Sequence, residues 1–195
     1  MMKLNLGCGQ DSREGYHNVD LMMPCDELLD LGKLPWPWQD GIADEILMLD
    51  FLEHFPYGKT DAILQECWRV LSTDGFVDIQ VPDFEICSDA ANVNLVGNHM
   101  CNFCGGNFRI FADEMSGGCS ECGKGPMEIA QAAMNRLYGG QDVEGNWHYT
   151  AFTKRMLQHK LMSFGFGKFK FLEEEHQRMN WNFKMRAFKL EDPWG

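Results

Sequence analysis

Residues 3–9 have the sequence Lys-Leu-Asn-Leu-Gly-Cys-Gly, a short apolar strand that runs straight into a glycine turn. Gly7 and Gly9 allow positive φ and let a ligand approach the main chain closely. Ligands of open α/β sheets bind beyond the carboxyl ends of the strands, where this turn is placed. A Gly-x-Gly pair alone also suits a simple strand-to-helix turn, so its meaning depends on the segments that follow.

A second strand is predicted at His17–Leu21, ending in the acidic Asp20. A carboxylate at this place can accept hydrogen bonds from both hydroxyls of a ribose, although a strand-terminating turn also favours aspartate. The dinucleotide fingerprint requires a third glycine where this chain has Ser12. The segment before Asp20 is also too short for a crossover helix, so the pattern disfavours a diphosphate cradle.

The next 60 residues alternate strand and helix patterns, which predicts an open, mostly parallel sheet covered on both faces. A buried strand at Asp44–Leu49 ends at Asp50, and a helix covers Tyr57–Leu71. We expect Gly75 to stop this helix before a strand at Phe76–Val81.

The end of the chain predicts a different arrangement. A helical pattern covers Phe152–Ser163, and apolar and polar residues then alternate over Gly165–Leu172 and Asn180–Leu190. Two alternating strands in succession indicate an antiparallel hairpin at the edge of the sheet. The predicted fold is therefore a Rossmann-like α/β sheet, mostly parallel, with an antiparallel C-terminal hairpin.

Four cysteines form two Cys-x-x-Cys pairs, Cys101 with Cys104 and Cys119 with Cys122, separated by 14 residues. This spacing is close to that of two-knuckle zinc sites, and nearby glycines suit tight turns around a tetrahedral ion. Four thiolates leave no open position, so the pattern predicts a structural Zn²⁺.

Composition limits the partners and the compartment. The chain has 195 residues and a formal net charge of −12, but the last 46 residues carry a basic excess. A strongly acidic protein does not find duplex DNA by electrostatics, so a nucleic-acid partner is disfavoured without being excluded. No apolar run reaches 18 residues and no signal peptide precedes the first strand, so we expect a cytoplasmic protein without a membrane partner.

Together these motifs resemble class I S-adenosylmethionine (SAM) dependent methyltransferases, over about residues 3–85 and more loosely 127–190. The closest similarity is to small predicted methyltransferases with an abbreviated first helix. Five motifs carry it in the expected order: Lys3–Gly9, Asn18–Leu21, Asp30-Leu31 with Leu34–Trp36, Asp44–Leu47 with Leu52–Phe55, and Glu66–Leu71 before Gly75. The resemblance implies a seven-stranded sheet with a reversed last strand.

The resemblance also implies a cofactor site for SAM. Gly7 and Gly9 would surround its methionine end with backbone from Cys8, and Asp20-Leu21 would hold the ribose. Asp30 and the main chain of Leu31 would meet the adenine edge, and Asp50 would lie beside the sulfonium. Glu53 and His54 match a family feature that is more often structural than catalytic.

We expect three parts: residues 1–96 as the SAM-binding part, 97–126 as a zinc-ribbon insertion, and 127–195 as the C-terminal part of the methyltransferase domain. The insertion is not part of the usual methyltransferase pattern. It follows the strand that ends at Val81, where such enzymes often build a substrate cover. A zinc ion would make this glycine-rich segment rigid, since the segment would otherwise lack a core.

Methyl transfer needs a base only if the acceptor loses a proton. The candidates are His148, in a polar and aromatic loop, and Asp83, which follows Val81-Pro82. His148 also suits a helix-capping role for the helix that follows. The expected function is transfer of a methyl group to an unidentified acceptor. A non-catalytic SAM-binding or zinc-ribbon interaction protein, and a nucleotide-dependent enzyme of the same fold, are the alternatives.

Overall fold

A computed structural model describes residues 2–91, 97–100, 107–110, 117–141, 145–173 and 181–191. Its main sheet has seven strands in the order β3-β2-β1-β4-β5-β10-β9. The strands are β1 (Met2–Leu6), β2 (His17–Asp20), β3 (Glu27–Leu28), β4 (Ala43–Leu49), β5 (Leu71–Pro82), β9 (Phe166–Leu172) and β10 (Asn182–Lys189).

Strands β1 to β5 of this sheet are parallel, whereas β10 is antiparallel to both of its neighbours, β5 and β9. The predicted mostly parallel sheet with an antiparallel C-terminal hairpin is therefore confirmed. The two-residue strand β3 was not predicted, because a segment so short has no readable alternation.

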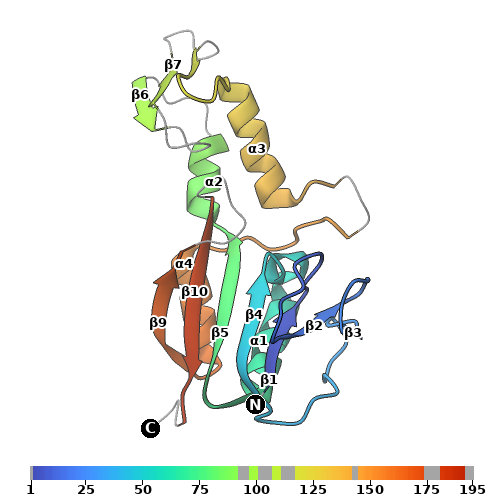
Figure 1. Ribbon diagram of the computed structural model, residues 1–195. Helices are drawn as coiled ribbons and strands as arrows, with labels where there is room; N and C mark the ends of the chain where they lie inside the picture. Colours follow the sequence, from blue (N-terminus) through green and yellow to red (C-terminus); the bar gives the residue numbers. More distant parts are fainter. Residues whose placement is uncertain are drawn as a thin grey trace.

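One face of the sheet is apolar and covered by helices. Helices α1 (Tyr57–Val70) and α4 (Lys154–Ser163) lie on the same side of the sheet (Figure 1). Ile63 and Leu64 of α1 and Leu157 of α4 share one buried cluster with Ile46 and Ile79 of the sheet. Burial of this apolar surface stabilises the main body.

The opposite face of the sheet is polar, so the prediction of helices on both faces was wrong. Arg186 of β10 donates two hydrogen bonds to the Asp78 carboxylate of β5, at 2.7 and 2.8 Å. On β4, Glu45 pairs with Lys3 at 2.8 Å and accepts a hydrogen bond from the Tyr16 hydroxyl. Cross-strand ion pairs stabilise this face, and no helix forms in the described chain between β1 and β4.

The predicted helix stop at Gly75 was also wrong. Helix α1 ends at Val70, and β5 begins at Leu71, which pairs with Ala43. The register then shifts so that Glu45 pairs with Phe76. A Cβ on Gly75 would lie 2.9 Å from the carbonyl oxygen of Ser72, so the glycine serves close backbone packing in this bulge.

A smaller unit projects beyond the carboxyl ends of the parallel strands (Figure 1). It contains α2 (Phe84–Ala91), α3 (Pro126–Tyr138) and a three-stranded antiparallel sheet of β6 (Gly97–Met100), β7 (Asn107–Ile110) and β8 (Gly117–Cys119). A second buried cluster joins α2, α3 and the start of β10 through Cys87, Ala133 and Trp181. Helix α2 was not predicted.

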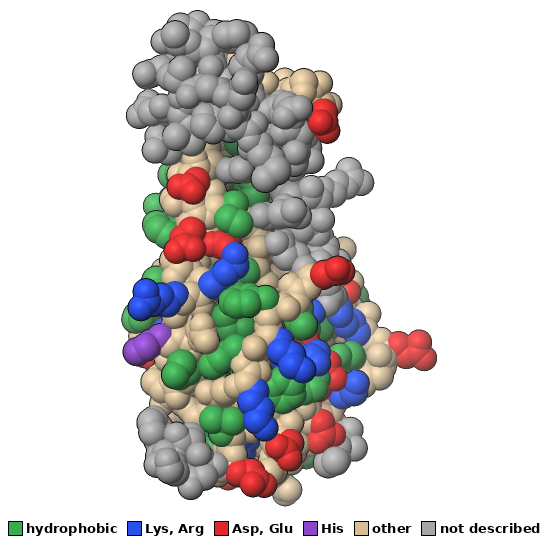
Figure 2. Space-filling view, turned by 90° about the vertical axis from the view of Figure 1, so that its left-hand side faces the viewer, with side chains coloured by type: hydrophobic (Ala, Val, Ile, Leu, Met, Phe, Trp, Pro, Cys, Tyr) green, Lys and Arg blue, Asp and Glu red, His purple; other side chains and the backbone are tan. Residues whose placement is uncertain are grey.

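Within the described ranges, no helix combines the length and the apolar character that a membrane span requires. On the side formed by β9 and α4, Figure 2 shows Lys and Arg side chains separated by hydrophobic and acidic ones. The basic side chains of the described residues in this view do not form a continuous surface of the kind that binds nucleic-acid phosphates.

Candidate functional site

The glycine turn and Asp20 are in direct contact. Gly7 and Gly9 have φ of +67° and +53°, values that favour glycine. The amides of Gly7 and Cys8 donate to the carbonyl oxygen of Val19, at 2.9 and 3.2 Å. The amide of Gly9 donates to the Asp20 carboxylate at 2.8 Å. The backbone of the turn therefore fixes this carboxylate at the carboxyl edge of the sheet.

The other residues expected to contact adenosine lie around a separate turn. Asp30 caps that turn by accepting the amide of Gly32 at 3.0 Å, and its other carboxylate oxygen lies 3.4 Å from the Lys33 ammonium. Leu31 is buried, and its carbonyl accepts the indole N–H of Trp36 at 3.0 Å. The side chain of Leu21 is exposed next to Asp20.

Asp50 lies at the end of β4, where its φ of +51° turns the chain out of the sheet. One carboxylate oxygen accepts hydrogen bonds from Arg136 at 2.5 Å and from Asn182 at 2.7 Å. Gln80 reaches the other oxygen at 3.3 Å. The charge of Asp50 is thus compensated by a residue of α3 that sequence reasoning did not select.

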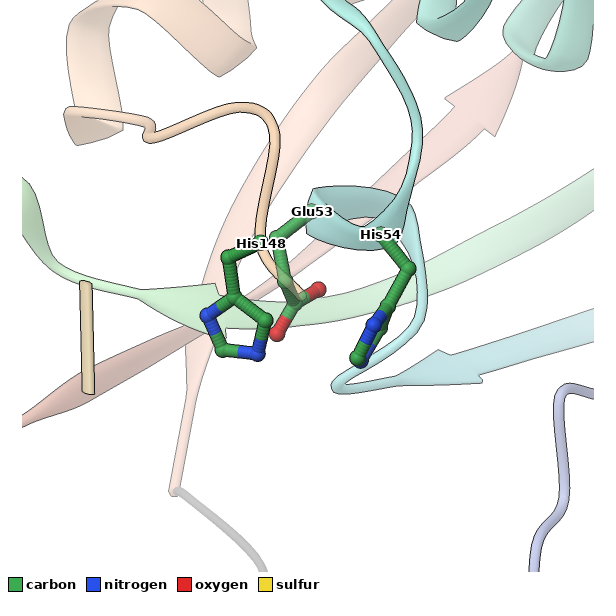
Figure 3. Close-up of side chains that lie close together, drawn as sticks. All are labelled: Glu53, His54 and His148. Atoms are coloured by element: carbon green, nitrogen blue, oxygen red, sulfur yellow. The ribbon is translucent and has the colours of Figure 1, made fainter. Parts of the chain in front are cut away.

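The short 3₁₀ helix η1 (Leu52–His54), which begins two residues beyond Asp50, brings Glu53 and His54 together with His148 (Figure 3). One potential ligand atom of each of the three lies within 4.8 Å of the others. The two imidazole rings meet edge to face, with centroids 4.7 Å apart. The motif Leu52–Phe55 singled out Glu53 and His54 in the sequence, but it does not reveal that His148 completes the cluster.

Burial sets the charge states in this cluster. Glu53 is fully buried, which together with the nearby Asp50 charge raises its pKa to about 8. Burial, followed by the neighbouring His54, lowers the pKa of His148 to about 4. His148 is therefore neutral at pH 7 and accepts a hydrogen bond more readily than it takes up a proton.

The loop that carries His148 is tied to η1 by main-chain hydrogen bonds. The amides of Tyr149 and Thr150 donate to the carbonyl of Glu53, at 2.8 and 3.2 Å, and the Thr150 hydroxyl donates to Phe55. The helix-capping role considered for His148 was wrong, because Thr153 caps α4 by accepting the amide of Met156 at 3.1 Å.

Asp83 occupies a structural position. Its carboxylate is fully buried, lies 3.0 Å from the Lys154 ammonium, and accepts the amide of Glu85 at 3.1 Å in the first turn of α2. The two candidate catalytic residues thus differ in exposure, since Asp83 is enclosed and His148 is partly exposed.

Of the four predicted zinc ligands, Cys101 and Cys104 lie outside the described residues. Cys119 and Cys122 form a knuckle in which the amide of Glu121 lies 3.4 Å from the Cys119 sulfur, and Gly123, at φ +71°, closes the turn on the Cys119 carbonyl at 3.0 Å.

Strand pairing places Cys119 at one end of the small sheet. Met100 pairs with Asn107, and Cys119 pairs with the next residue, Phe108.

No family model and no curated protein sequence matches this chain. Its fold is similar to that of solved SAM-dependent methyltransferases. One is 1,6-didemethyltoxoflavin-N1-methyltransferase from Burkholderia thailandensis, bound to 1,6-didemethyltoxoflavin and S-adenosylhomocysteine, with TM-score 0.53 and 14% identity over 97% of this chain and 71% of that one.

Two further methyltransferase structures match this chain over most of their own length. The SAM-dependent methyltransferase of Methanosarcina mazei has TM-score 0.53 and 15% identity, covering 97% of this chain and 92% of its own. That of Archaeoglobus fulgidus has TM-score 0.55 and 10% identity, covering 96% and 86%. The fold is therefore that of class I SAM-dependent methyltransferases.

Proposed function

We propose that this protein is a SAM-dependent methyltransferase with an unidentified acceptor. The observation that carries the proposal is the hydrogen bond from the Gly9 amide to the Asp20 carboxylate. Through it, the carboxylate that would bind the ribose lies against the turn that would surround the methionine end of SAM. Asp30 and Leu31 would border the adenine, and Asp50 would lie beside the sulfonium.

The chemistry requires little beyond positioning. The acceptor atom attacks the methyl carbon, the bond from carbon to sulfur breaks, and S-adenosylhomocysteine leaves with the electron pair on sulfur. Holding acceptor and methyl group in line supplies much of the rate. His148, which is neutral at pH 7, would orient the acceptor by accepting a hydrogen bond from it.

A thermal-shift comparison of SAM, S-adenosylhomocysteine, NAD and ATP tests the cofactor, because a ligand that binds only the folded state raises the unfolding midpoint. We expect only the first two to do so. A shift with NAD or ATP alone would favour the nucleotide-dependent alternative. SAM binding without S-adenosylhomocysteine release across a broad acceptor screen would favour the non-catalytic alternative.

We further propose that residues 97–126 form a zinc ribbon that covers the acceptor side of the site. The amide-to-sulfur contact and the positive φ of Gly123 support it, since thiolate ligands commonly accept such hydrogen bonds in tight turns. A Cys₄ site requires reduced thiols, in keeping with the cytoplasmic location that we propose.

Replacement of Cys119 by serine is expected to remove the ribbon zinc. Purified wild type should contain one zinc per chain at this site, measured by elemental analysis, and the variant should lose most of it because serine is a poor zinc ligand. Cys25→Ser is the matched control, since this cysteine lies near β3 and should leave the zinc content unchanged. A stable wild-type protein without zinc would contradict the ribbon.

A further inference from the structure

Glu53 is a buried carboxylate without a compensating contact of its own. Its side chain is inaccessible to solvent, and neither carboxylate oxygen has a hydrogen-bond partner in another residue of the described chain. Burial without a partner favours the protonated form of this side chain, and a cation at its oxygens would allow it to ionise. The buried Glu53 oxygens are therefore suited to a positively charged ligand.

The two histidines beside Glu53 present nitrogens suited to a metal ion. Nδ1 of His148 lies 2.9 Å from the carbonyl oxygen of Arg136, and Nδ1 of His54 lies 3.2 and 3.1 Å from the carbonyls of Gly145 and Trp147. A carbonyl only accepts, so Nδ1 carries the proton in both rings. Nε2 then keeps its lone pair, as in metal-binding histidines whose second nitrogen is held by a carbonyl.

From these contacts we propose that Glu53, His54 and His148 bind one divalent transition-metal ion. Two histidines and one carboxylate are a ligand set for Zn²⁺ and Fe²⁺ that leaves coordination positions open. The potential ligand atoms already lie within 4.8 Å of one another, and modest side-chain rotation closes this spread to metal–ligand bonds of about 2.0–2.2 Å. The loop hydrogen bonds to Glu53 and Phe55 hold His148 in place for this.

The position of this site indicates what the ion would do. It lies three residues from Asp50, at the carboxyl edge of the sheet, and both histidines are partly exposed. A metal ion acts as a Lewis acid on an oxygen that fills an open position and lowers the pKa of a bound hydroxyl. We therefore expect an acceptor with a metal-binding hydroxyl, which the ion would orient in place of the hydrogen bond to His148. This step rests on the proposed methyltransferase function, whereas metal binding itself does not.

Cobalt binding to the zinc-loaded full-length protein tests the site without SAM. One molar equivalent of Zn²⁺ is first added, which the cysteine thiolates bind in preference to the histidine site. Co²⁺ is then added, and bound zinc and cobalt are measured by elemental analysis and visible absorption. We expect one Co²⁺ per wild-type chain and at least tenfold weaker binding in each of Glu53→Gln, His54→Gln and His148→Gln. His159→Gln, an exposed histidine of α4, is the matched control and should bind as wild type does.

Each variant is also checked for its unfolding midpoint and for the shift produced by S-adenosylhomocysteine, so that loss of folding or of the cofactor site is recognised separately. Glu53→Gln is nearly isosteric and replaces a buried acid by an uncharged amide, so we expect it to fold. Absence of bound cobalt in the wild type, or wild-type affinity in the folded variants, would overturn the metal site while leaving the proposed methyltransferase function intact.

Discussion

Asp20→Ala is expected to weaken binding of S-adenosylhomocysteine on the order of 100-fold in calorimetry. Each hydrogen bond to a charged group is worth roughly 1.5–3 kcal/mol, and roughly 1.4 kcal/mol changes affinity tenfold. The carboxylate would accept both ribose hydroxyls, and its present partners, the amides of Gly9 and Met22, leave it further acceptor capacity.

The ribose contact is isolated by changing the ligand as well as the protein. Wild type should discriminate between S-adenosylhomocysteine and its 2′-deoxy analogue, and Asp20→Ala should not, because the residue that senses the hydroxyl is gone. Asp20→Asn keeps an acceptor for the Gly9 amide, so its discrimination between the two ligands should lie between that of wild type and that of Asp20→Ala. An Asp20→Ala protein with unchanged affinity for the adenosyl ligand would refute the proposed cofactor site.

Gly7→Ala is expected to destabilise the whole domain. A Cβ at this position would lie 2.1 Å from a ring carbon of Phe51, which is itself buried, and φ at Gly7 is +67°. The left-handed conformation costs alanine roughly 1–2 kcal/mol, and overpacking adds roughly 1–3 kcal/mol. For a chain of this length the unfolding midpoint should fall by roughly 5–15 °C.

Gly9→Ala separates the clash from the backbone strain. Gly9 has a similar φ of +53°, but a Cβ there would meet no atom within 4 Å. Its midpoint should therefore fall less than that of Gly7→Ala, and Phe51→Leu should partly rescue Gly7→Ala by making room. Equal losses in the two glycine variants would show that the Phe51 ring moves aside freely.

Local patterns were sufficient for most of the fold. Strand β1, helix α1 and the hairpin of β9 and β10 each carry several residues of one periodicity, and their predicted bounds lie within a few residues of the observed ones. Helices on both faces were predicted wrongly because strand residues such as Asp78 and Lys184 were not recognised as a polar face. Asp78 and Lys184 form an ion pair between β5 and β10, which are distant in sequence.

The candidate site was predictable only where its residues adjoin a strand end. Gly9 and Asp20 could be paired because both follow neighbouring parallel strands. Glu53 was matched only to a family feature that is more often structural than catalytic. Its contact with the loop that carries His148, 95 residues further along the chain, leaves no local pattern in the sequence. Arg136 was missed for the same reason: its contact with Asp50 spans two units of the fold.

Helix α3 has a mechanical consequence. It starts four residues after Cys122 and ends just beyond Arg136, whose guanidinium grips Asp50 and whose carbonyl holds the His148 ring. Thirteen helical residues make a stiff rod of roughly 20 Å. A displacement of its cysteine end would therefore be transmitted along the helix to Arg136, and through Arg136 to Asp50 and His148.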